Sequence, residues 1–175
     1  MSLRMSSRGA MSQHRHVWTG DPMTHNGRML GVIGGSGFYS FFGPDARAIN
    51  LDTPYGSPSA AITVGTVGDH EVAFLPRHGV NHEFSPHTVP YRANMWALRA
   101  LGVRRVFGPC AVGSLDPQLG PGAMVVPDQL VDRTHRRVSS YVETGAVHLP
   151  FADPYCAQVS GALTGAADDI TAGGT

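Results

Sequence analysis

A short apolar run that ends in glycines, spanning Leu30 to Phe38, constrains the fold of this chain most strongly. Its apolar half, Leu30 to Ile33, is typical of a buried strand, and the glycines that follow predict a turn leaving that strand. Successive backbone N–H groups in such a turn form a concavity suited to an anion, and Ser36 adds a hydroxyl. The stretch therefore predicts a strand followed by a phosphate-binding loop.

Three better-known glycine motifs do not describe this loop. A dinucleotide-binding fingerprint needs a third glycine where Ser40 stands. A Walker loop needs a lysine, and the chain contains none. A nucleophile elbow needs a glycine where Phe38 stands. The loop is therefore a phosphate-binding candidate of a different kind.

The amino-acid composition limits the classes of protein to which this chain can belong. The 175 residues are 42% hydrophobic and 15% charged, with a formal net charge of zero, which suits one folded domain with a real core. This balance argues against a nucleic-acid or membrane-surface partner. All 13 basic residues are arginines, whose planar guanidinium groups suit phosphate, and Schiff-base chemistry is excluded.

The two cysteines and the N-terminal region indicate the cellular compartment of the protein and where its folded domain begins. The two cysteines, Cys110 and Cys156, form no Cys-x-x-Cys pair, which indicates a reducing, cytoplasmic setting. Residues 1–28 are rich in arginine and histidine without hydrophobic periodicity, so we expect a disordered extension before a folded domain over 29–175. We expect neither a secretory signal nor a membrane span.

Several further elements can be predicted. Residues 60–67 and 71–76 indicate a hairpin that turns at residues 68–70. A helix is expected from Val89 to Leu101, with Tyr91, Met95 and Leu98 sharing one face.

The remaining predicted elements lie further along the chain. Strands are expected at Val106–Phe107 and Ala123–Val126, and a second helix around 156–164, capped by Asp153. Strands alternating with helices favour an α/β fold.

Polar side chains follow two of these predicted strands. Arg77 and His78 come directly after the hairpin, and Cys110 and Ala111 follow the strand at 106–107. Loops at strand ends are where α/β proteins place ligands. If these ends converge with the Ser36 loop, backbone N–H groups, a hydroxyl, a guanidinium and an imidazole form one anion site.

An ordered set of motifs resembles the S-methyl-5′-thioadenosine phosphorylases and their purine nucleoside phosphorylase relatives over about residues 29–158. The motifs that carry this resemblance are Gly31–Gly37, Thr53–Gly56, Arg77–Gly79 with His82, Tyr91–Leu98, Ala111–Leu115, Val126–Gln129, His148 and Phe151–Cys156.

The resemblance implies a single α/β domain with a central mixed sheet flanked by helices. It also implies cleavage of the N-glycosidic bond of a purine nucleoside by inorganic phosphate, without a metal or organic cofactor. The products of a methylthioadenosine substrate are adenine and 5-methylthioribose 1-phosphate. The family is typically a homotrimer.

The resemblance also assigns roles to individual residues. Ser36, Arg77, His78, Cys110 and Ala111 match the phosphate-binding positions, with Cys110 standing where the family often has threonine. A second group comprises His82, which resembles a residue near the sugar, and His148, which resembles one that reaches into a neighbouring subunit. The group that protonates the purine is expected beyond Thr175, because the sequence looks unfinished there.

Other interpretations stay open from the sequence. The same motifs serve a 6-oxopurine phosphorylase acting on inosine or guanosine. The chain is alternatively a truncated, non-catalytic protein that binds phosphate. His78 and His82 are four residues apart and can pair on a metal, although no third ligand is evident.

Overall fold

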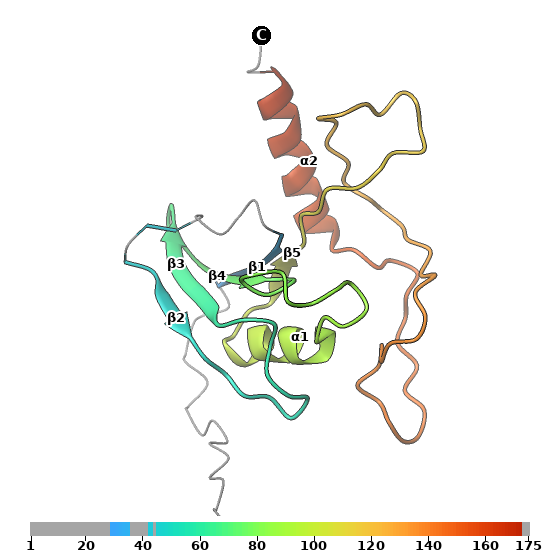
Figure 1. Cartoon of the computed structure of the whole chain (residues 1–175). Coiled ribbons are helices and arrows are strands. Elements are labelled where there is room, and N and C mark those ends of the chain that lie inside the picture. Colours follow the sequence, from blue (N-terminus) through green and yellow to red (C-terminus); the bar gives the residue numbers. More distant parts are fainter. Residues whose placement is uncertain (1–28, 36–41, 44, 173–175) are drawn as a thin grey trace, which may run out of the picture.

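The computed structural model describes residues 29–35, 42, 43 and 45–172, and in this part of the chain five strands form one mixed sheet (Figure 1). The predicted mixed α/β fold is therefore confirmed. The expected N-terminal extension, residues 1–28, lies outside the described residues. The elements are β1 (Leu30–Gly34), β2 (Arg47–Ile49), β3 (Ile62–Val67), β4 (His70–Pro76), α1 (Tyr91–Ala100), β5 (Arg105–Phe107) and α2 (Ala157–Ala172).

The strand order is β2-β3-β4-β1-β5. The predicted hairpin is confirmed as β3 and β4, which pair antiparallel as far as Val67 opposite His70, so the turn itself is residues 68 and 69. In contrast, β1 runs parallel to both β4 and β5. Because parallel strands end at the same edge of a sheet, β1, β4 and β5 deliver the segments that follow them to one place.

The helix predicted over 89–101 forms as α1, and of the residues expected to share a face Leu98 is buried whereas Met95 is exposed. Ala93, Ala97 and Leu98 are buried, whereas Met95 is 43% exposed. The small alanine side chains allow the helix axis to approach the sheet closely. The helix is rotated so that this alanine face meets the sheet and Met95 faces solvent. The core between helix and sheet is formed by Met29, Ile62, Val64, Ala73, Leu75, Ala97, Leu98, Leu101 and Val103.

Residues 110–156, called the exposed segment below, form no helix or strand, and none of them is buried. The strand predicted at Ala123–Val126 is therefore wrong, and Val125 is 60% exposed. An apolar run becomes a strand only where a neighbouring strand pairs with its backbone, and here none does. In Figure 1 the exposed segment, drawn in yellow to orange, loops away from the sheet.

The second predicted helix forms as α2, and it extends to Ala172 rather than ending near residue 164. Its N-terminus is capped by Cys156 instead of the predicted Asp153. Hydrogen bonds from the backbone N–H groups of Val159 and then Gln158 lower the pKa of the exposed Cys156 thiol. Neither helix in the described part of the chain is long and apolar enough to cross a membrane.

The packing of α1 gives a first testable prediction. We expect Leu98→Ala to lower the free energy of unfolding by about 2–5 kcal/mol, because it leaves a cavity between helix and sheet. Met95→Ala on the same helix should cost far less, since Met95 faces solvent. Urea unfolding followed by circular dichroism measures both, and equal losses in the two variants would contradict this packing.

Candidate functional site

Arg77 joins the ends of the three parallel strands. Its Nη2 donates hydrogen bonds to the Ile33 carbonyl at 3.2 Å and to the Pro109 carbonyl at 2.8 Å. Its backbone N–H donates to the Gly34 carbonyl at 2.9 Å. These carbonyls belong to the end of β1 and to the loop after β5, so this side chain contacts the segments at the ends of β1 and β5.

The Arg77 guanidinium keeps capacity to bind a further group. Its Nε and Nη1 make no hydrogen bond with any described residue, and no carboxylate there forms an ion pair with it. The group is half-buried and permanently charged. A half-buried cation with free donors at a sheet edge is suited to an anion, and phosphate matches its planar geometry.

His78 follows directly and is held in one orientation. Its Nδ1 lies 2.9 Å from the Phe84 carbonyl, and the Phe84 N–H donates to the His78 carbonyl at 3.1 Å. Because a carbonyl only accepts, Nδ1 carries a proton, and Nε2 stays available to a further group. These two bonds close residues 78–84 into a loop beside Arg77.

The His82 ring stacks on that of His78, with centroids 6.0 Å apart and planes within 4° of each other. The structure thus brings two predicted site residues, one for phosphate and one for the sugar, side by side. The alternative of a metal pair gains no third ligand, because the described residues contain no group of three or more histidine, cysteine, aspartate or glutamate side chains placed to hold a metal ion.

Glu83 and Gly79 shape the same loop. Asn81 donates to both Glu83 carboxylate oxygens, from its backbone and its side chain, each at 3.1 Å. A hydrogen bond from the Glu83 backbone, followed by those from Asn81 and the charge of His82, lowers the pKa of the exposed Glu83 carboxyl. Gly79 has φ +82°, and a Cβ there would collide with the Glu83 carboxylate, so the loop requires glycine.

The other predicted phosphate residues are placed less completely. Cys110 and Ala111 are exposed and follow Pro109 directly, so their backbone begins next to the carbonyl that Arg77 contacts. Ser36 lies outside the described residues, one position after the last described residue of the loop that leaves β1.

The structure does not place His148 at the ends of β1, β4 and β5. It lies on the exposed segment, is itself exposed, and makes no hydrogen bond, ion pair or ring contact with the described part of the chain. Its side chain is therefore available to another surface.

A polar cluster that sequence reasoning missed ties the exposed segment to α1. Arg92 Nη1 lies 2.7 Å from Glu143 Oε1 and 3.3 Å from the Ser140 carbonyl. The Arg92 guanidinium sits 4.7 Å above the Tyr55 ring, which meets Tyr141 edge-on at 5.1 Å. The Tyr141 hydroxyl donates to the Arg92 carbonyl at 2.8 Å. No local pattern in the sequence marks these residues, because the partners of Arg92 in the exposed segment lie 48 to 51 positions away from it.

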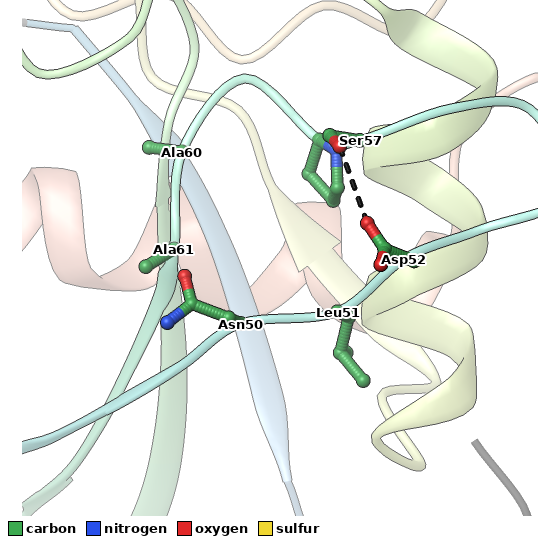
Figure 2. Close-up of a pocket in the computed structure, with 7 residues that line it drawn as sticks. Asn50, Leu51, Asp52, Ser57, Ala60 and Ala61 are labelled. Carbon is green, nitrogen blue, oxygen red and sulfur yellow. Dashed lines mark hydrogen bonds between the residues drawn. The ribbon is translucent and has the colours of Figure 1, made fainter. Parts of the chain in front are cut away.

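A hollow of about 230 Å³ lies elsewhere, between β2 and β3 (Figure 2). There the Ser57 hydroxyl donates to Asp52 Oδ1 at 3.3 Å. A carboxylate repels phosphate, and none of the predicted site residues contributes to the lining. The candidate site is therefore the edge at Arg77. The lining residues are Asn50, Leu51, Asp52, Ser57, Pro58, Ala60 and Ala61.

The mixed sheet with its helices is the fold of the solved phosphorylases that this chain resembles. Residues 29–172 match the family model described as the Phosphorylase superfamily, and the chain belongs to that family.

Within the family, the chain is 75% identical over 137 residues to an S-methyl-5′-thioadenosine phosphorylase of Mycolicibacterium smegmatis, covering 78% of this chain and 53% of that protein. It is 72% identical over 143 residues to the Mycobacterium tuberculosis protein of the same name, covering 82% and 54%. A crystal structure of a methylthioadenosine phosphorylase from an antarctic soil metagenomic library superposes with a TM-score of 0.75 at 45% identity, covering 80% and 50%. The chain thus spans about half the length of these relatives.

The polar cluster gives a second testable prediction. Replacing Arg92 with methionine removes the ion pair and the cation–π contact, which contribute roughly 0.5–1 kcal/mol each. We expect backbone amides of residues 139–143 to exchange hydrogen several-fold faster. Arg99→Met on the same helix is the matched control, because exposed Arg99 contacts none of these groups. Unchanged exchange in the Arg92 variant would show that the cluster does not anchor the segment.

Proposed function

We propose that this chain carries the phosphate-binding part of an S-methyl-5′-thioadenosine phosphorylase. The observation that carries the proposal is the half-buried Arg77 guanidinium, which joins three parallel strand ends and keeps unused donors beside His78. High identity to proteins of that name supports the choice of substrate.

In the proposed reaction, inorganic phosphate attacks the anomeric carbon of the sugar as the C–N bond to adenine breaks. The bond's electron pair leaves with the purine, which takes up a proton, and 5-methylthioribose 1-phosphate forms. The sugar carbon becomes cationic on the way, so a phosphate dianion held against it stabilises the transition state. Positioning by Arg77 and neighbouring donors supplies this effect without a covalent intermediate on the enzyme.

Other residues are proposed to act around this centre. Ser36 donates its hydroxyl, the Cys110 and Ala111 backbone donates N–H groups, and His82 lies beside the sugar. The location of Cys110 and Ala111 next to Pro109 supports their part, as does the stacking of His82 on His78.

We also propose the setting in which the site acts. Inorganic phosphate is a co-substrate, with no metal or organic cofactor, and the enzyme works in the cytoplasm. The exposed His148 reaches a neighbouring subunit of a homotrimer, which its lack of contacts in its own chain supports.

The substrate assignment has a direct test. A version of the protein as long as its relatives is incubated with methylthioadenosine, with and without inorganic phosphate, and adenine release is followed by chromatography. We expect phosphate-dependent release. Inosine and guanosine run in parallel, and a preference for them supports the 6-oxopurine alternative. Phosphate binding without any release identifies a non-catalytic phosphate-binding protein, and neither binding nor release would refute the proposal.

The role of Arg77 has its own test. Arg77→Ala should weaken inorganic phosphate binding by roughly 1.5–3 kcal/mol, about 10- to 150-fold, because it removes charge-assisted hydrogen bonds. Calorimetric titration measures the affinity, and thermal unfolding checks that the variant folds. Arg104→Ala is the control, since Arg104 is exposed and contacts no described side chain. Equal affinities in both variants would remove Arg77 from the site.

A further inference from the structure

Only two polar side chains in the described part of the chain are buried, and they bond to each other. Asn94 of α1 is 2% exposed, and Ser59, which precedes β3, is 7% exposed. Asparagine is a poor helix former, and burying its amide costs free energy unless hydrogen bonds compensate. We therefore ask which part of the backbone these two buried side chains hold in place.

The hydrogen bonds of the pair fix the orientation of both residues. The Ser59 backbone N–H donates to Asn94 Oδ1 at 2.8 Å, and because an N–H only donates, the acceptor there is the amide oxygen. The Ser59 hydroxyl lies 2.7 Å from the Pro76 carbonyl and 3.2 Å from Asn94 Oδ1. Its one hydrogen therefore points to Pro76, the closer acceptor.

Pro76 is the last residue of β4, directly before Arg77. Proline has no N–H, so its carbonyl is the one backbone group through which hydrogen bonds can fix it. Pro76 lies opposite Gly34 in the ladder with β1, and the next N–H, that of Arg77, bonds to the Gly34 carbonyl at 2.9 Å. The peptide plane between Pro76 and Arg77 is thus held on one side by Ser59, with a longer bond of 3.4 Å from the Gly79 N–H, and on the other side by β1.

We propose that Ser59 and Asn94 are positioning residues for Arg77. Asn94 holds Ser59, Ser59 holds the Pro76 carbonyl, and this fixes the direction in which Arg77 leaves the sheet toward the Ile33 and Pro109 carbonyls. The helix α1, which contacts none of the predicted phosphate residues by a hydrogen bond, thereby sets the geometry of the site. The inference rests on the proposed function in one respect only, namely the effect of these two residues on phosphate binding.

Ser59→Ala tests the proposal in the 175-residue chain by hydrogen exchange. We expect the Arg77 amide, and the Arg77 guanidinium signals in NMR spectra, to exchange roughly two- to tenfold faster, the effect of one hydrogen bond. The Ala73 amide in the middle of β4 reports global stability and should change less. Ser59→Thr, which retains a hydroxyl, should restore slow exchange at Arg77.

Two further variants sharpen the comparison. Ser57→Ala lies two residues away and removes only the bond to the exposed Asp52, so Arg77 should exchange as in the unmodified chain. Asn94→Ala removes the acceptor of the Ser59 backbone N–H, which holds Ser59 in place, and should also make the Arg77 amide exchange faster. If Arg77 and Ala73 accelerate equally in Ser59→Ala, the pair is merely part of the core and the proposal is overturned.

Titration with inorganic phosphate separates this inference from the proposed function. Ser59→Ala should weaken phosphate binding by a factor similar to its effect on Arg77 exchange, while Ser57→Ala should not. If the unmodified chain binds no phosphate but Arg77 exchange responds as expected, the positioning role stands and the phosphate function fails. If phosphate binds equally to both variants while Arg77 loosens, the positioning has no functional consequence and that part of the proposal fails.

Discussion

The parallel pairing of β1 with both β4 and β5 is the interaction on which the site depends. It requires a close approach on the β5 side, where a Cβ at Gly31 would lie 2.8 Å from a Val103 methyl and 3.3 Å from a Val106 methyl. A larger residue would push β5 away from β1. The Pro109 carbonyl would then move out of reach of Arg77, and the three strand ends would no longer meet through one side chain.

Local patterns in the sequence were sufficient to predict those elements that depend on neighbouring residues. Two strand-like runs and the turn residues between them predicted the β3–β4 hairpin, and proline and glycine marked the ends of α1. Arg77 was selected because ligands bind in the loops at strand ends of α/β proteins. The strand predicted at Ala123–Val126 was wrong for a physical reason. An apolar run gives a segment the propensity to form a strand, but the partner strand has to come from another part of the protein.

The sequence could not reveal the interactions that join distant segments. Asn94 accepts a buried hydrogen bond from Ser59, 35 positions away. Arg92 bonds to Glu143, 51 positions away. Both are polar contacts whose partner depends on how α1 is rotated, and neighbouring residues in the sequence do not determine that rotation.

The exposed segment poses a different energetic problem. Its apolar side chains, among them Val112, Leu115, Val131 and Leu149, face solvent, so hydrophobic burial does not hold it in place. What the described residues offer instead is the polar cluster around Arg92 and the Arg137 guanidinium 4.3 Å above the Tyr91 ring, and an ion pair with an exposed carboxylate contributes at most about 1 kcal/mol. Extensive apolar surface on an ordered protein marks an interface with further protein. The same segment carries His148, which agrees with our proposal that this residue acts at a neighbouring subunit rather than in its own.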